Sequence, residues 1–137
     1  MFQNPSEGER CALLKRVRNI AVVGLSPNPA RPSYGVARAM QQFGYNIIPV
    51  HSSAQQVLGA RAYPRLADVP LPIELVNVFR RAEHIGEVVD ECLRLGLKAL
   101  WIQEGIVNLA AAERARAGGM TVVMDRCIYR DYRDYCA

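Results

Sequence analysis

Hydrophobic positions along the chain form short runs that alternate with longer stretches of helical periodicity. The short runs are typical of buried strands, with a further edge strand expected near Tyr63; they cover residues 20–25, 45–50, 75–79, 99–102 and 121–124. The periodic stretches predict helices over residues 34–43, 83–95 and 108–117. Strands that alternate with such helices predict a parallel sheet with right-handed crossovers and helices on both faces.

Capping residues, prolines and glycines indicate where these elements begin and end. Ser6 and Glu9 have the spacing of a capping box, which predicts a short first helix. Residues 26–32 contain three prolines and are expected to form a loop. Ser33 then suits the N-cap of the next helix, and Gly44 suits its end.

The length and composition favour one domain. The chain has 137 residues and 50% hydrophobic content, enough for one core but not for two ordinary domains. We therefore expect a single α/β, doubly wound Rossmann-like domain over residues 1–137. Its three-layer core should span residues 19–125 around a mainly parallel sheet of about five to six strands, flanked by a short N-terminal helix and a C-terminal tail.

No stretch has the uninterrupted apolar length of a membrane helix, and the N-terminus lacks the apolar segment of a signal peptide. We therefore expect a cytoplasmic protein without a membrane partner. The four cysteines form no CxxC pair, so neither a zinc ribbon nor a thioredoxin-type motif is supported. We expect free thiols, with Cys92 in the core and both Cys127 and Cys136 in a polar, accessible tail.

Charge is distributed unevenly along the chain. The net charge is +4, and residues 10–67 hold eight basic residues and no acidic one. This bias fits either an anionic ligand or a solvated basic surface. Signatures of helix-turn-helix, RNP and zinc-finger proteins are absent, so nucleic acid is not the expected partner.

Ligands of open parallel sheets bind beyond the carboxyl ends of the strands. The first such loop leads into a helix N-terminus, which favours a phosphate, and Gly24 permits close backbone approach. Ser26 and Ser33 add hydroxyl groups there. Charge-assisted hydrogen bonds to phosphate are expected from three arginines, which are Arg31, Arg80 and Arg81.

A plain nicotinamide or flavin dinucleotide is disfavoured. The loop after Gly24 lacks the GxGxxG pattern, and the second strand ends in His51 instead of an acidic residue that would hold a ribose hydroxyl. A phosphorylated ribose, such as the 3′-phosphorylated ribose of coenzyme A, suits a neutral or basic strand end. His51 fits a ligand contact better than a general base, since no carboxylate or nucleophile partner is evident.

Four segments together resemble a known family: IAVVGLSPNPARPSYGVARAMQQFGYNIIPV, VNVFRRAEHI, LWIQEGIVN and VVMDRCIY. Between Ile20 and Tyr129 the chain looks like the small stand-alone CoA-binding proteins of bacteria and archaea. These are similar to the N-terminal domain of the succinyl-CoA synthetase α subunit. One departure is that His51, Ser52 and Ser53 stand where many relatives have Pro-Lys, which leaves a lysine contact to the 3′-phosphate in doubt.

The resemblance implies roles for particular residues. Residues 24–26 and 31–34 would cradle the nucleotide phosphates, and residues 50–52 would face the ribose. Residues 79–81 would flank the adenine or pyrophosphate, and Gln103 would lie toward the pantetheine arm. The implied cofactor-binding residues are Gly24, Leu25, Ser26, Arg31, Pro32, Ser33, Tyr34, Val50, His51, Ser52, Phe79, Arg80, Arg81 and Gln103.

Three functions remain open. The leading expectation is non-catalytic binding of coenzyme A or an acyl-CoA; ligase activity is not expected, since the chain lacks the synthetase's second domain. The second is an enzyme acting on a CoA thioester or nucleotide through Glu104, His51 or Cys127. The third is an interaction protein with a vestigial pocket, whose tail, residues 129–135, docks on a protein partner that the sequence does not identify.

Overall fold

The computed structural model describes residues 1–137 and contains one five-stranded sheet in which every neighbouring pair is parallel. The strand order is β2-β1-β5-β6-β7. The strands are β1 (Asn19–Val23), β2 (Asn46–Val50), β5 (Leu75–Val78), β6 (Ala99–Gln103) and β7 (Thr121–Arg126). A separate two-stranded hairpin consists of β3 (Gln56–Val57) and β4 (Ala60–Arg61). The expected edge strand near Tyr63 is a single bridge to Val50.

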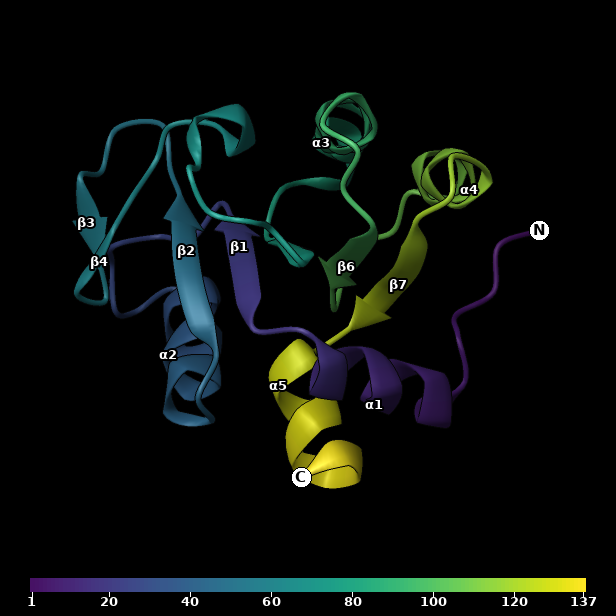
Figure 1. The fold of residues 1–137 in the computed structure, drawn as a ribbon, viewed down its shortest axis with the longest axis horizontal. Coiled ribbons are helices and arrows are strands. Elements are labelled where there is room, and N and C mark those ends of the chain that lie inside the picture. The colour runs from purple at the N-terminus through teal and green to yellow at the C-terminus, as the bar shows by residue number, and fades with distance from the viewer.

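Helices cover both faces of the sheet (Figure 1). One face carries α1 (Glu7–Arg16), α2 (Pro32–Gln42) and α5 (Ile128–Asp131), and the other carries α3 (Ile85–Arg94) and α4 (Leu109–Ala117). Single 3₁₀ turns lie at Leu66–Asp68 and Ala82–His84. The structure therefore confirms the doubly wound, three-layer α/β fold.

Alternation along each strand supplies two hydrophobic cores. In β1, Ala21 and Val23 face the core under α3 and α4, whereas Ile20 and Val22 face the core under α1, α2 and α5. Trp101 of β6 is fully buried in this second core, and its Nε1 donates to the Arg126 carbonyl at 2.9 Å. Because side chains on a strand point alternately to the two faces, an apolar run without polar interruption is what a strand covered on both sides requires.

Local capping explains where the helices begin. Ser6 and Glu9 form the expected capping box at α1, and Asn108 caps α4 by accepting from the Ala111 N–H. The expectation that Ser33 caps α2 is wrong. Arg31 occupies the N-cap and Pro32 the first turn, as suits a residue without an N–H, and this leaves the Ser33 hydroxyl for the preceding loop.

The expectation of a polar C-terminal tail is also wrong. After α5, which packs against α2, the chain continues as a π-helical segment, Tyr132–Cys136, packed against α1. Ile128, Tyr132 and Cys136 recur every four residues and contact the core beneath α1 and α2. The ring of Tyr132 stacks on Phe43 with centroids 4.3 Å apart. The hydrophobic effect therefore holds this segment against the domain.

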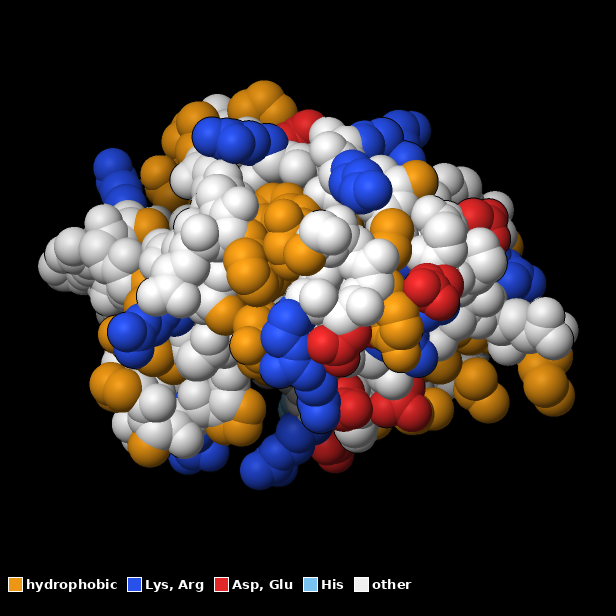
Figure 2. Space-filling model, turned by 90° about the horizontal axis from the view of Figure 1, so that it is seen from below, with side chains coloured by type: hydrophobic (Ala, Val, Ile, Leu, Met, Phe, Trp, Pro, Cys, Tyr) orange, Lys and Arg blue, Asp and Glu red, His pale blue; other side chains and the backbone are white.

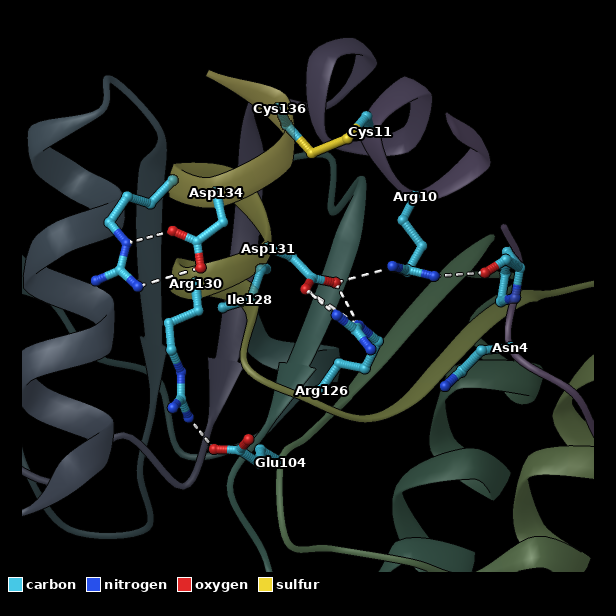
Figure 3. Close-up of polar contacts among 12 residues, drawn as sticks. Asn4, Arg10, Cys11, Glu104, Arg126, Ile128, Arg130, Asp131, Asp134 and Cys136 are labelled. Atoms are coloured by element: carbon cyan, nitrogen blue, oxygen red, sulfur yellow. Dashed lines mark hydrogen bonds and ion pairs between the residues drawn. A yellow bond between two sulfur atoms is a disulfide. The ribbon is translucent and has the colours of Figure 1, made fainter. Parts of the chain in front are cut away.

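Two of the four cysteines are bonded, which corrects the expectation of free thiols. Cys11 of α1 and Cys136 form a disulfide across 125 residues of sequence (Figure 3). Cys92 and Cys127 are free, and both are buried. Periodicity revealed the burial of Cys92, but the disulfide depends on packing of the C-terminal segment, which was expected to be a tail.

An ion-pair network also fixes the C-terminal segment (Figure 3). Asp131 is 3% exposed, and its carboxylate accepts from Arg10 Nε at 2.9 Å and from Arg126 Nη2 at 2.7 Å. A buried charge is tolerated when it is paired and hydrogen-bonded in this way. Through Asp131, the C-terminal segment is held to both α1 and the end of β7.

The surface carries both signs of charge. On the face seen in Figure 2, Lys and Arg side chains lie next to Asp and Glu side chains, and hydrophobic side chains gather near its centre. This face therefore lacks the uniform basic field typical of nucleic-acid-binding surfaces. None of the helices is both long and apolar enough to span a membrane.

Candidate functional site

The strand order reverses between β1 and β5, because the chain leaves β1 toward β2 on one side and returns to β5 on the other. A crevice opens beyond the carboxyl ends of the strands at such a switch point. Here Val23 is paired with Val50 and with Val78, so the three strands end at the same level. The loops after them consequently share one edge of the sheet.

Two adjoining clefts lie along this edge. The first has a volume of about 880 Å³. It is lined by Gly24, Ser26, Arg31, Pro32, Ser33, Val36, Phe79, Arg80, Arg81, Ala82, Gln103, Glu104, Gly105, Ile106, Cys127 and Arg130. The second, of about 550 Å³, shares Gly24, Ser26, Phe79 and Arg80 with the first and extends to Val50, His51 and Ser52. Together the clefts reach the ends of all five parallel strands.

Most residues that the sequence suggested line one of these clefts, but two do not. Leu25 is fully buried, and Tyr34 packs against the core beneath α1 and α2. Neither side chain lines a cleft. The local pattern placed both residues beyond the carboxyl end of β1 but did not resolve which way their side chains turn.

Gly24 is the point of closest approach between strand ends. Its φ is +84°, and a Cβ built at this position would lie 2.3 Å from the Phe79 carbonyl oxygen. Its N–H donates to the Val50 carbonyl at 3.1 Å. Glycine is therefore required here both by backbone conformation and by space.

The loop between β1 and α2 is held by its own hydrogen bonds. The Ser33 hydroxyl oxygen accepts from the Ser26 N–H at 3.0 Å, and the Ser26 hydroxyl oxygen accepts from the Asn28 N–H at 3.1 Å. The Asn28 side chain in turn accepts from the Ala30 N–H at 3.0 Å. These bonds fix the loop without using the Arg31 side chain.

Arg31, Arg80 and Arg81 line the first cleft, and none of the three guanidinium groups makes an ion pair or a hydrogen bond within the chain. Pro32, Ser33 and Val36 place the N-terminal turn of α2 at the same cleft. Uncompensated cations beside a helix N-terminus favour an anionic ligand.

His51 has a defined tautomer. Its Nδ1 accepts from the backbone N–H groups of Ser53 at 3.1 Å and of Ala54 at 2.9 Å. Nδ1 is therefore unprotonated, and the proton of the neutral ring lies on Nε2, which makes this nitrogen a donor. No carboxylate is hydrogen-bonded to the ring, so the geometry suits ligand contact and not a general base.

At the other end of the first cleft, Gln103 is fixed by a buried network. Its Oε1 accepts from Asn77 Nδ2 at 3.3 Å and from the Ile128 N–H at 3.4 Å. Because the Ile128 N–H can only donate, the side-chain atom facing it is the oxygen. The Gln103 amide nitrogen consequently faces away from this network, and no protein acceptor bonds it.

Two cleft residues that follow β7 were absent from the expected binding set: Arg130, and Cys127, which was named only as a reacting group of the alternative enzyme. Arg130 forms an ion pair with Glu104 (Figure 3). Its pKa is raised by its interaction with the Cys127 thiol and, less strongly, by the Glu104 carboxylate. The four-residue spacing of Ile128, Tyr132 and Cys136 was the signal that could have revealed a helix here.

Two known proteins match this chain over nearly its full length. Uncharacterized protein YneT of Bacillus subtilis (strain 168) is 44% identical over 127 residues, which cover 93% of this chain and 94% of that protein. The solved structure of a hypothetical protein from Pyrococcus horikoshii OT3 superimposes with a TM-score of 0.93 at 28% identity, covering 100% of this chain and 99% of that one.

A longer relative matches over part of its length. Acetate–CoA ligase (ADP-forming) II of Archaeoglobus fulgidus is 28% identical over 83 residues, which are 59% of this chain but only 12% of the ligase. The family described as CoA binding domain matches residues 18–133, which include both clefts and the C-terminal segment up to Arg133. The chain therefore belongs to the CoA-binding domain family.

Proposed function

We propose that this protein binds coenzyme A, or an acyl-CoA, across the two adjoining clefts. The main observation behind this proposal is that three arginine side chains, Arg31, Arg80 and Arg81, have no partner within the protein. They line the first cleft, at the point beside Gly24 where the strand order reverses. A pyrophosphate there would receive charge-assisted hydrogen bonds, which are about twice as strong as neutral ones. Membership of the family supports coenzyme A as the ligand that carries this pyrophosphate.

The shape of the site supports an extended ligand. Five parallel strand ends at a spacing of about 4.8 Å cover about 19 Å. The adenosine end would lie in the second cleft, where His51 Nε2 and the Ser52 hydroxyl can donate to the 3′-phosphorylated ribose. The pantetheine arm would run through the first cleft toward Gln103 and β7.

We infer that binding alone, without turnover of the ligand, is the function. Two of the three candidate acid, base or nucleophile groups are already engaged: Glu104 is paired with Arg130, and His51 Nδ1 is occupied by backbone donors. The third, Cys127, has no hydrogen-bonded base beside it. An enzyme acting on a CoA thioester would need Glu104 or His51 to be released from these partners, or a base to be placed beside Cys127.

Calorimetric titration tests the proposal. We expect coenzyme A to bind, and dephospho-CoA, ADP and NAD to bind more weakly. Arg31→Ala should weaken coenzyme A binding about tenfold or more, because a hydrogen bond to a charged group contributes roughly 1.5–3 kcal/mol. Arg38→Ala is the matched control, since Arg38 is an exposed arginine of α2 that lies outside both clefts.

Two results would contradict the proposal. Equal weakening by Arg31→Ala and Arg38→Ala would show that only the overall charge matters. Absence of heat with every ligand would favour the alternative in which the pocket is vestigial and the protein acts through a protein partner.

A further inference from the structure

The two free cysteines lie in different environments. Cys92 lies fully buried in the core beneath α3, and burial raises the pKa of its thiol to about 12. Cys127 follows β7 directly and lines the first cleft, although the residue is only 7% exposed. Cys127 is therefore the single free thiol that a ligand in the cleft can reach.

A β-bulge sets the position of Cys127. Met124 pairs with Ile102 and Arg126 pairs with Gln103, so Asp125 is an extra residue in β7. Asp125 has a φ of +62°, and its carboxylate accepts from the Gly105 N–H at 2.7 Å. Bulges of this kind bend a strand and redirect the residues that follow it.

Gln103 independently supplies a free hydrogen-bond donor for a ligand at this end of the cleft. The residue is 6% exposed and lines the cleft, yet its amide nitrogen has no acceptor within the chain. Its Oε1 is bonded to the N–H of Ile128, the residue directly after Cys127. The Gln103 amide nitrogen is not among the buried unpartnered atoms of the chain, so it is accessible from the cleft and can donate to an acceptor on the ligand, such as a pantetheine carbonyl, beside Cys127.

Arg130 adds a cation to the same place. It lines the cleft, lies beside the Cys127 thiol and forms an ion pair with Glu104, which lines the same cleft (Figure 3). The cleft lining therefore brings Cys127, Gln103 and Arg130 together.

We propose that Cys127 is a covalent attachment site for the thiol end of coenzyme A, where the two sulfur atoms form a mixed disulfide. This inference rests on the proposed function, because it takes the ligand already placed in the clefts and adds a reaction at its end. Coenzyme A carries its thiol at the far end of the pantetheine arm, and that arm would end beside Cys127.

The reaction is a thiol–disulfide exchange with the disulfide of coenzyme A, which supplies the oxidising equivalent. The Cys127 thiolate attacks one sulfur of that disulfide and forms the Sγ–S bond. The original S–S bond breaks, and its electron pair leaves with the second coenzyme A as a thiolate, which takes up the proton that Cys127 released. The products are one modified chain and one free coenzyme A thiol.

Intact-mass spectrometry of the protein incubated with coenzyme A disulfide tests this site. We expect a mass increase of one coenzyme A less two hydrogens, located by peptide mapping at Cys127 and not at Cys92, and reversed by dithiothreitol. Cys127→Ser should abolish the adduct. The reaction should be at least roughly tenfold faster than with glutathione disulfide, because binding of the nucleotide raises the effective concentration of its disulfide.

Arg31→Ala separates a directed reaction from a merely reactive thiol. This variant should slow the adduct with coenzyme A disulfide and leave the reaction with glutathione disulfide unchanged. Equal rates with both disulfides, or an adduct located elsewhere than Cys127, would overturn the inference. If reduced coenzyme A binds the unmodified protein by calorimetry but no adduct forms, the covalent site is wrong and the proposed function stands; if coenzyme A does not bind, both fail.

Discussion

Gly24→Ala is expected to destabilise the protein by about 2–5 kcal/mol, from about 1–2 kcal/mol for a left-handed alanine and about 1–3 kcal/mol for overpacking. The added methyl group would lie 2.3 Å from the Phe79 carbonyl oxygen, which is backbone and cannot rotate away. Separating β1 from β5 would relieve the overlap, but these strands form the switch point. Binding of coenzyme A should therefore be lost as well.

Gly35→Ala is the matched control for this substitution. Gly35 lies in α2 with no atom near the position of an added Cβ. Because alanine is the better helix former, this variant should gain about 0.5–1 kcal/mol. Urea unfolding measures the change in unfolding free energy of both variants, and we expect the slope of that free energy against urea concentration to stay unchanged. If Gly24→Ala unfolds at the same urea concentration as the unsubstituted protein, the close approach of the two strand ends is not rigid.

The fold was predictable because both sides of each strand are covered. An uninterrupted apolar run such as residues 20–23 fits a strand buried on two faces, and glycines such as Gly44, with a φ of +106°, end the helices between them. The three arginines were also predictable, since loops after parallel strands meet at one edge. Hydrophobic periodicity and the expected parallel topology were therefore enough to predict the sheet and about half of the residues that line the candidate site.

The rest of the site depends on tertiary contacts. Ser33 has the chemistry of an N-cap, but Pro32 begins the helix one residue earlier and redirects the hydroxyl to the Ser26 N–H. The C-terminal segment is rich in charged residues, and its helical conformation follows from packing against α1 and α2. The burial of Asp131 between Arg10 and Arg126 could not be predicted from the sequence, because it depends on the packing of α5 against α1 and the end of β7. For this reason Arg130 was not assigned to the cleft, and Cys127 was named only as a reacting group of the alternative enzyme.

Removal of the Cys11–Cys136 disulfide is expected to cost about 4–5 kcal/mol of unfolding free energy, because the bond closes a loop of more than a hundred residues in the unfolded chain. The bond joins residues 125 positions apart, which makes the unfolded chain nearly circular. We expect Cys11→Ala with Cys136→Ala to unfold at a clearly lower temperature. Dithiothreitol should lower the midpoint of the unsubstituted protein to a similar value and leave that of the double variant unchanged.

Thiol titration in denaturant without reductant should count the two free cysteines, Cys92 and Cys127, and a count of four would contradict the disulfide. The cleft should survive its loss, since Asp131 still pairs with Arg10 and Arg126, and Tyr132 still stacks on Phe43. Coenzyme A affinity should therefore change little while stability falls. Loss of affinity in the double variant would instead show that the disulfide itself holds Cys127 and Arg130 at the cleft.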